Sequence, residues 1–372
     1  MKRILITGGA GFIGHHFVEH LLKYTDWEIV VLDRLNYAST GFDRLRDIKV
    51  FDGNRVKVFT ADFTKPIVEG LAQELGQFDY IVHMGAETHV DNSISNPEPF
   101  VIANVVGTMR MLDFARLQSN LTQFVYFSTD EVFGPAGPEA KFPEWARYNS
   151  GNPYAASKAG GEELALAYAN TYRLPVLITH TMNVFGERQH PEKFIPGTIK
   201  KILSGETVMI HSNPAKTQAG SRFYIHARNV AATLMFLLDR YSMKDPVSVV
   251  PHGMYWRPNK YADKFNIVGE QEVDNFQMMM FIYNTLKDIS DVNGGAIKIS
   301  GWLKSSTFKE IFMPKLKYEM VDFHSSRPGH DLRYALDGKK LKEMGWSLPM
   351  NFEQSLKKTI EWTIANPRWL QI

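Results

Sequence analysis

The sequence contains no cysteine among its 372 residues. This absence excludes disulfide bonds, catalysis by a thiolate and zinc sites built on cysteine. A chain without cysteine suits a reducing compartment, so we expect a cytoplasmic protein. No clustered set of metal ligands stands out in the sequence, and we expect no metal site.

The sequence also lacks an excess of charge and a long apolar run. Lys and Arg together number 42 and Asp and Glu 40, giving a formal net charge of +2. This balance does not indicate nucleic acid or a membrane as a partner. The apolar residues 4–6 end at Thr7, too early for the core of a signal peptide or for a membrane span.

Apolar runs typical of buried strands alternate with segments of helical periodicity in the first half of the chain. The expected strands are 3–7, 28–33, 56–60, 80–84, 123–128 and 175–179, and the expected helices are 12–24, 67–75, 99–118 and 152–172. This alternation predicts an α/β fold with a Rossmann-type, doubly wound parallel sheet. After about residue 185 prolines such as Pro191 and Pro314 divide the pattern into shorter elements.

We therefore predict two interleaved domains. Residues 1–182 form the Rossmann domain, and residues 183–372 form mainly a smaller substrate domain, with some segments that return to the first domain.

The most complete local motif is Gly9-x-Gly11-x-x-Gly14, which follows the first expected strand and opens the first expected helix. Such glycines permit a tight turn close to a pyrophosphate, and the helix N-terminus supplies free N–H groups. Asp33 ends the second strand, where its carboxylate accepts hydrogen bonds from ribose hydroxyls and repels a 2′-phosphate. The motif favours NAD over NADP, although the cationic Arg34 adjoins Asp33.

A wider set of residues is expected to contact the cofactor. Small residues follow the fourth strand, where they let the chain pass close to the dinucleotide. After the third strand, residues 62–63 are expected to border the adenine. The set is Gly8, Gly11, Phe12, Ile13, Gly14, Asp33, Asp62, Phe63, Gly85 and Ala86.

Tyr154 and Lys158 lie four residues apart in an expected helix, and therefore on one face of it. An ammonium group near a phenol favours the phenolate and lowers its pKa. Such a tyrosine can accept a proton from a sugar hydroxyl while the carbon loses hydride to NAD, so both residues also belong to the cofactor site. Upstream, Thr129 precedes two adjacent carboxyl groups, Asp130 and Glu131.

These motifs belong to longer runs that resemble the extended short-chain dehydrogenases/reductases and, more narrowly, the dTDP-glucose 4,6-dehydratases. The similar runs are 7–14, 83–94, 128–134, 152–158, 191–196 and 327–334, which together span nearly the whole chain. The Thr-Asp-Glu triplet and the Arg-Pro-Gly-His-Asp run at 327–331 are the more specific of them.

The resemblance implies a nucleotide-sugar 4,6-dehydratase that uses NAD, with dTDP-glucose as the expected substrate. Tyr154 would take the C4 hydroxyl proton as hydride leaves C4, and Thr129 would hydrogen-bond that hydroxyl. Glu131 would remove the C5 proton, and protonated Asp130 would donate to the departing C6 hydroxyl. Hydride would then return to C6, giving a 4-keto-6-deoxy sugar nucleotide.

The resemblance also implies a substrate site. Thr88 would contact the sugar, Asn183 the diphosphate and Glu192 and Lys193 the nucleotide, while Arg222 and Arg327 would pair with phosphate oxygens. The chain departs from the family at Val184, at Phe223 and in a longer stretch over 212–221. These departures leave a dTDP-, UDP-, CDP- or GDP-hexose open as substrate.

Two other functions remain open. A 4-epimerase or a UDP-glucuronate decarboxylase also begins by oxidising C4, but commonly lacks the Asp–Glu pair. A non-catalytic NAD-binding protein predicts the loss of Tyr154, Lys158 or Thr129, all of which are present.

The resemblance further implies a homodimer in which the helices near 99–118 and 154–172 form a four-helix bundle. The apolar positions available for it are Val101, Val105, Met109, Leu112, Leu164, Leu166 and Tyr168, which internal packing could equally use.

Overall fold

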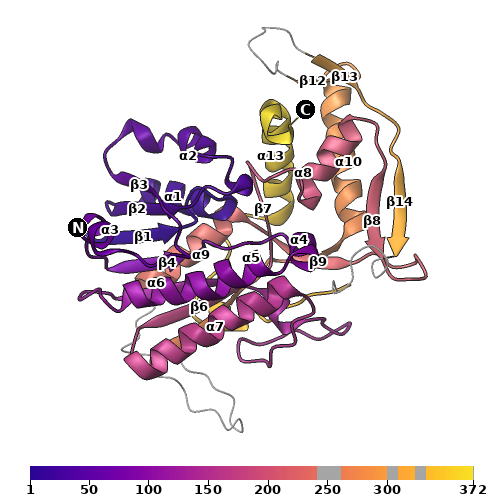
Figure 1. Ribbon diagram of the computed structural model, residues 1–372. Coiled ribbons are helices and arrows are strands. Elements are labelled where there is room, and N and C mark those ends of the chain that lie inside the picture. The colour runs from indigo at the N-terminus through magenta and orange to yellow at the C-terminus, as the bar shows by residue number, and fades with distance from the viewer. Residues whose placement is uncertain (241–260, 300–308, 323–331, 372) are drawn as a thin grey trace. The chain divides into compact units, whose positions relative to one another are not determined.

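The computed structural model describes residues 1–240, 261–299, 309–322 and 332–371 (Figure 1). The chain divides into two compact units that alternate along the sequence. Unit 1 comprises the described residues of Met1–Thr181, Arg228–Val268 and Leu336–Ser347, and unit 2 those of Met182–Ala227, Gly269–Ala335 and Leu348–Ile372. The assignment of cofactor binding to one part of the chain and substrate binding to the other stays a prediction.

Unit 1 is built on a seven-stranded parallel sheet with the order β10-β6-β5-β4-β1-β2-β3. The strands are β1 (Arg3–Thr7), β2 (Glu28–Asp33), β3 (Val56–Thr60), β4 (Tyr80–His83), β5 (Gln123–Thr129), β6 (Val176–Thr181) and β10 (Ala262–Ile267). Every residue of β4, β5 and β6 is buried, as expected for parallel strands covered on both faces. The predicted doubly wound α/β fold is confirmed.

The strand order reverses between β1 and β4, which lie side by side although β2 and β3 come between them in sequence. Thr7 and His83, the last residues of the two strands, are register partners. In sheets of this kind, ligands bind outside the carboxyl ends of the strands at such a reversal. The glycine turn follows β1 directly, so it lies at this edge of the sheet.

Helices α3 (Glu69–Leu75), α6 (Gly107–Ala115) and α7 (Pro153–Tyr172) cover one face of this sheet. Their apolar side chains, Leu75, Met111 and Leu166 among them, share one core with strand residues such as Phe124 and Ile178. Helices α6 and α7 run side by side in Figure 1. Helix α1 (Phe12–Tyr24) has the predicted bounds.

The single helix predicted over 99–118 is wrong in detail. The chain forms α5 (Glu98–Val101), a π-helical segment η3 (Ile102–Val106) and α6, which ends at Ala115. A Cβ on Gly107 would lie 2.8 Å from the Phe63 ring, so the wider turn occurs where a distant aromatic side chain packs against the helix.

Unit 2 contains a three-stranded sheet of β11 (Glu272–Asp274), β9 (Ser221–His226) and β7 (Asn183–Phe185). A parallel pair joins β8 (Val208–Ser212) to β14 (Tyr318–Asp322), and an antiparallel pair joins β12 (Ala296–Ile299) to β13 (Lys309–Phe312). Helices α8 (Phe194–Leu203), α10 (Asn275–Val292) and α13 (Phe352–Ala365) pack on one core.

The expected division into shorter elements after residue 185 does not hold for the helices there. Helix α9 (Ala227–Arg240), which belongs to unit 1, has 14 residues, α10 has 18 and α13 has 14. A capping box of Asp274 and Gln277 begins α10. Pro196 lies in the first turn of α8, where proline does not interrupt a helix.

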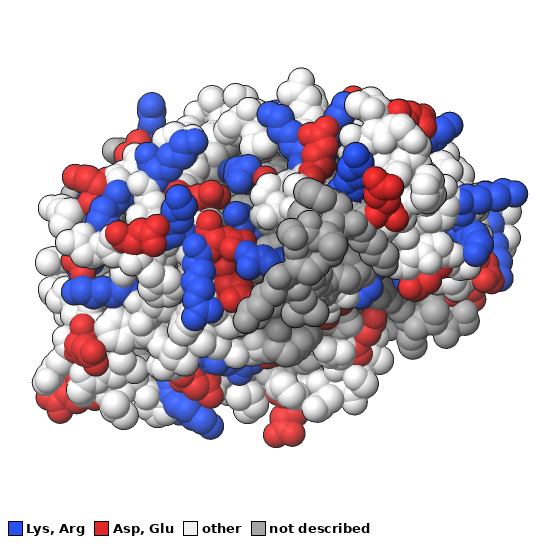
Figure 2. Space-filling model, turned by 90° about the horizontal axis from the view of Figure 1, so that it is seen from above, with Lys and Arg blue, Asp and Glu red and all other residues white. Residues whose placement is uncertain are grey.

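Charged side chains of both signs are intermingled on the face drawn in Figure 2. Among the helices that the structure describes, none is long and apolar enough to cross a membrane.

Candidate active site

The glycine turn after β1 is closely packed against the start of the loop that follows β4. Gly8 has a φ of +71°, and a Cβ on it would lie 2.8 Å from the Gly85 nitrogen. The Gly11 N–H donates to the Gly8 carbonyl at 3.0 Å, and a Cβ on Gly14 would overlap that same carbonyl oxygen. Helix α1 begins at Phe12 without a side-chain cap, which leaves its first N–H groups for an anion. The turn therefore fits a pyrophosphate.

Asp33 is buried at the end of β2 and is fixed by two backbone N–H groups. Its Oδ2 accepts from Ala10 at 3.0 Å and its Oδ1 from Leu35 at 2.8 Å. Burial raises the pKa of Asp33 above its ordinary value. The carboxylate is thus held at the position where the sequence predicts the ribose.

The neighbouring Arg34 forms an ion pair with Glu87, which the sequence analysis did not single out. Asn36 donates to the same Glu87 oxygen at 3.2 Å. The cation that weakened the prediction of NAD is therefore neutralised within the chain. No short-range signal points to this pair, because 53 positions separate its members.

The expected adenine edge at 62–63 needs a correction. The Phe63 side chain is only 3% exposed, and its ring packs edge-on against His83 with centroids 5.4 Å apart. A Cβ on Gly85 would lie 2.6 Å from that ring, so Gly85 is small because Phe63 fills the adjacent space. If Phe63 contacts a nucleotide, its backbone makes the contact, because its side chain is buried. Asp62 is exposed beside it, and Ala86 follows Gly85 partly buried.

Thr129 connects the predicted catalytic groups. Its hydroxyl donates to Asp130 Oδ1 at 3.0 Å and accepts from the Glu131 N–H at 3.3 Å. It ends β5, and the turn η4 (Asp130–Phe133) follows it directly. The charges of Glu131 and Asp130 raise the pKa of Tyr154, so the phenol predicted to accept the proton lies near both carboxyl groups.

Asn152, predicted to start the helix over 152–172 but not predicted as a site residue, also belongs to this constellation. Its amide nitrogen donates to Glu131 Oε2 at 3.0 Å. Its amide oxygen accepts from the Ala155 N–H at 2.9 Å and so caps α7. The signal that could have found it is the asparagine directly before Pro153 at the start of the predicted helix.

Tyr154 and Lys158 are both buried on α7. The Lys158 ammonium donates to the Phe127 carbonyl at 2.7 Å and lies 4.3 Å from the centre of the Tyr126 ring. Burial lowers the pKa of Lys158 to about 7, and the charge of Glu162 opposes this shift. Burial raises the pKa of Tyr154 well above its usual value, as do the charges of Glu131 and Asp130, while the Thr129 hydrogen bond lowers it. The lowered phenol pKa expected from Lys158 is therefore not found in this structure.

The predicted substrate residues lie in both units. Thr88, in unit 1, is exposed between β4 and α4 (Val90–Ser95). In unit 2, Asn183 is exposed at the start of β7, and Glu192 precedes Lys193, the N-cap of α8, with 3.8 Å between their charged groups. Arg327 lies outside the described residues.

Arg222, on β9 of unit 2, is the most firmly held of these residues. Its Nη1 donates to the carbonyls of Ser221 at 2.7 Å and Leu332 at 2.8 Å. Its guanidinium lies 4.5 Å from the centre of the Tyr334 ring.

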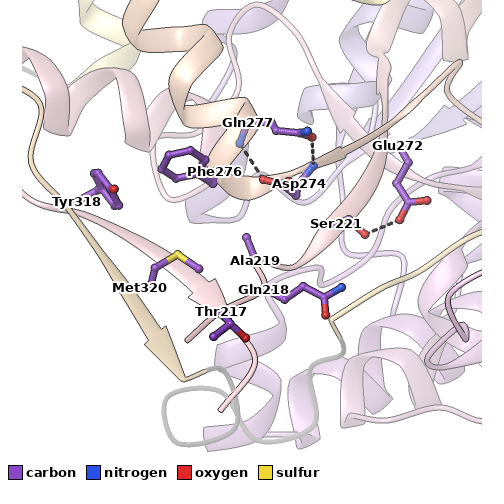
Figure 3. A pocket seen from close by; sticks show the side chains of 10 residues that line it. All are labelled: Thr217, Gln218, Ala219, Ser221, Glu272, Asp274, Phe276, Gln277, Tyr318 and Met320. Carbon is purple, nitrogen blue, oxygen red and sulfur yellow. Dashed lines mark hydrogen bonds between the residues drawn. The ribbon is translucent and has the colours of Figure 1, made fainter. Parts of the chain in front are cut away.

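A pocket of about 620 Å³ opens in unit 2 next to β9 and the start of α10 (Figure 3). The rings of Phe276 and Tyr318 lie on one side of it, with centroids 5.3 Å apart. Gln218 lines it from the 212–221 stretch, which Asn213 folds into a turn by accepting from the Thr217 N–H at 2.8 Å. The segment that departs from the resembled family thus shapes a cavity.

A model of the NAD dependent epimerase/dehydratase family matches residues 4–250, which include the glycine turn, the Thr129 cluster and the Tyr154–Lys158 pair. The chain belongs to this family. It is therefore a member of an NAD-dependent enzyme family, and the closed glycine turn fits that cofactor.

Relatives along the whole chain carry a narrower name. The chain is 32% identical to a probable dTDP-glucose 4,6-dehydratase of Sinorhizobium fredii, over 99% of this chain and 95% of that one. It is also 32% identical to the dTDP-glucose 4,6-dehydratase of Salmonella typhimurium, over 99% and 94%. The resemblance seen in the sequence is confirmed.

Solved structures agree with this result. The dTDP-glucose 4,6-dehydratase DesIV of Streptomyces venezuelae, solved with NAD bound, matches with a TM-score of 0.75 at 32% identity, covering 99% of this chain and 98% of that one. A UDP-glucuronic acid 4-epimerase of Bacillus cereus also matches at 0.75, over 98% and 99%, but at 20% identity this shows only the shared fold.

Proposed function

We propose that this enzyme is a nucleotide-sugar 4,6-dehydratase, which converts an NDP-hexose into the NDP-4-keto-6-deoxyhexose and water, with dTDP-glucose as the first substrate to test. The observation that carries the proposal is the cluster at the end of β5. The Thr129 hydroxyl joins Asp130 to the Glu131 backbone, and both carboxyl groups lie close enough to the Tyr154 phenol to raise its pKa. An acid, a base and a proton acceptor therefore lie around one point, as elimination of water next to an oxidised carbon requires.

Tyr154 in its phenolate form accepts the proton of the C4 hydroxyl, and the Thr129 hydroxyl hydrogen-bonds that substrate hydroxyl. The Lys158 ammonium, one turn along the same helix, favours the phenolate that Tyr154 must be before it accepts this proton, and a neutral phenol results from the transfer. NAD⁺ supplies the hydride acceptor and a positive charge when it is bound. The residues proposed to hold it are those of the glycine turn, Asp33 and the backbone after β3 and β4.

The two carboxyl groups act on the neighbouring carbons. Glu131, held by the Asn152 amide, removes the C5 proton, which the C4 ketone has made acidic. Asp130 is buried and donates a proton to the leaving C6 hydroxyl. Adjacent carboxyl groups resist ionising together, which favours one neutral acid beside one charged base.

The alternative functions require less of this site. Epimerisation and decarboxylation also begin with oxidation of C4, but neither needs an acid and a base at C5 and C6. The solved epimerase shares only the fold with this chain. The retained Asp130–Glu131 pair, fixed by Thr129 and Asn152, therefore supports dehydration.

The test is Glu131→Gln in the purified, NAD-loaded enzyme. Loss of the base should reduce formation of the 4-keto-6-deoxy product about 10²–10⁴-fold, whereas NADH still forms transiently at the C4 step. Exchange of the C5 hydrogen with deuterated water should stop. The matched control is Glu139→Gln, an exposed position in the same loop. Full product formation by the Glu131 variant would refute the role of Glu131 as the base. Dehydration itself would be refuted if the unmodified enzyme formed no 4-keto-6-deoxy product from any of a panel of dTDP-, UDP-, CDP- and GDP-hexoses, and the same panel would identify the substrate.

We also propose the homodimer, through the exposed side of the α5–α6 path and of α7. Val101 is 46% and Ile102 39% exposed, so two adjacent large apolar side chains lie at the surface of this path. Leu112 and Leu166, two positions predicted for this interface, are instead buried in the core of unit 1. Val105, Met109, Leu164 and Tyr168 are partly buried and remain candidates. Light scattering that finds only monomer would remove this proposal.

A further inference from the structure

Glu162 is a fully buried carboxylate that the proposed reaction does not use. It lies on α7, one turn after Lys158 and two turns after Tyr154, and is 0% exposed. The hydroxyls of Ser128 and Tyr148 both donate to it. His180 Nε2 lies 3.0 Å and Lys264 Nζ 3.6 Å from its Oε2. A single carboxylate therefore joins α7 to β5, to β6, to β10 and to the loop that follows Glu131.

The partners of Glu162 are themselves connected. The Lys264 ammonium donates to the Tyr148 hydroxyl and lies 5.0 Å from the centre of the Trp145 ring. On the other side, His180 Nδ1 lies 3.1 Å from Asn266 Oδ1, and the Asn266 amide donates to the Phe142 carbonyl at 3.0 Å. These contacts hold the loop after η4, which begins next to Asp130 and Glu131, against the sheet.

A buried charge is costly unless it is well compensated, so this arrangement keeps Glu162 ionised by several contacts at once. Burial raises its pKa, but His180, Lys264 and the Ser128 hydroxyl outweigh that effect and lower the pKa to about 2. Glu162 is therefore negative throughout the neutral range. The nearest cation of the proposed reaction, Lys158, lies at the i−4 position of the same helix.

We propose that Glu162 is a positioning residue of this enzyme. Its carboxylate keeps the Lys158 ammonium charged, and it fixes Ser128, the residue before Thr129, against the helix that carries Tyr154. The inference rests on the proposed function, since it assigns roles to Lys158 and Thr129 in that reaction.

The groups that face Lys158 decide its charge. On α7 this is Glu162, on β5 the Phe127 carbonyl and the Tyr126 ring, and on β4 His83. Burial and the charge of Lys158 lower the pKa of His83 to about 3, so His83 is neutral. Because burial already lowers the Lys158 pKa to about 7, the loss of Glu162 lowers it further and removes the ammonium at neutral pH.

The experiment compares Glu162→Gln with Glu163→Gln, its exposed neighbour on the same helix. Glutamine retains the shape of the side chain and an acceptor for Ser128 but removes the charge. The alkaline limb of the pH profile of kcat/KM should move to lower pH by about one unit in the Glu162 variant and stay unchanged in the Glu163 variant. The pH dependence of NAD binding, followed by quenching of protein fluorescence, should shift in the same direction.

A second variant separates the charge effect from a loss of folding. Glu162→Gln leaves Lys264 without its anion, so Glu162→Gln/Lys264→Met should recover Tm while the alkaline limb remains shifted. A profile that does not move while Tm falls would overturn the inference and leave Glu162 with a structural role alone. If the unmodified enzyme yields no 4-keto-6-deoxy product, the proposed function fails. The shift in NAD binding still tests the role of Glu162 in that case.

Discussion

The two units of this chain present their predicted functional residues in different ways. In unit 1, Thr129, Asp130 and Tyr154 are buried, Thr129 donates to Asp130, and the charge of Asp130 raises the pKa of Tyr154. In unit 2, Asn183 is exposed and Gln218 lines an open pocket. Proton transfer demands groups held at hydrogen-bond distance, whereas recognition of a substrate can be shared among many weaker contacts. The difference indicates that the chemistry of this enzyme is fixed more narrowly than its choice of substrate.

The substitution with the largest expected effect lies in unit 1 and tests whether its glycine turn binds the cofactor. In Gly14→Ala, the new Cβ overlaps the Gly8 carbonyl oxygen, and overpacking of this kind costs about 1–3 kcal/mol. We expect NAD affinity to fall about 10–100-fold in a calorimetric titration. The control is Gly70→Ala in α3, where a Cβ meets nothing within 4 Å. Unchanged NAD affinity in the Gly14 variant would show that the turn is not the pyrophosphate site.

A smaller effect is expected for Arg222→Lys in unit 2. Lysine keeps the charge but loses the planar group that donates to two carbonyls and stacks on Tyr334. The KM for the nucleotide sugar should rise about tenfold with little change in kcat, as expected for lost ground-state binding. The control is Arg368→Lys, an exposed arginine in the same unit. A fall in kcat at constant KM would contradict a binding role.

The smallest effect is expected for Gln218→Ala, which tests whether the pocket takes part in substrate choice. The ratio of kcat/KM for dTDP-glucose to that for UDP-glucose should change about threefold. The corresponding free energy is within the range that one hydrogen bond contributes. Stability should be unaffected, because the Gln218 side chain is exposed. Lys216→Ala, on the same loop but outside the pocket lining, is the control. An identical ratio in both variants would exclude the pocket from recognition of the base.

Much of unit 1 could be predicted from the sequence, because its signals are local. The apolar runs predict β1, β2 and β3 with their observed bounds. The glycine motif correctly predicts a turn in which backbone packs so closely against backbone that no Cβ would fit. Thr129 and Tyr154 were identified through motifs, and the structure brings them together.

What could not be predicted depends on partners far apart in sequence. The Phe63 ring packs against Gly107, the residue directly after the π-helical segment 102–106, and the Arg34–Glu87 pair joins two loops. Glu162 adjoins the exposed Glu163 in an ordinary-looking helix, and only the fold shows that His180 and Lys264 surround it. Prolines in the second half mark ends of elements, but they do not give the lengths of α9, α10 and α13, which lie between them.

Asn152 has a consequence for how this site tolerates change. Its side chain donates toward the base and accepts from the first turn of the helix at the same time. Aspartate would preserve the helix start but set a second anion against Glu131, and serine is too short to serve both neighbours. The start of α7 and the orientation of Glu131 thus depend on a single amide group. A substitution at position 152 that improves one of them therefore also affects the other.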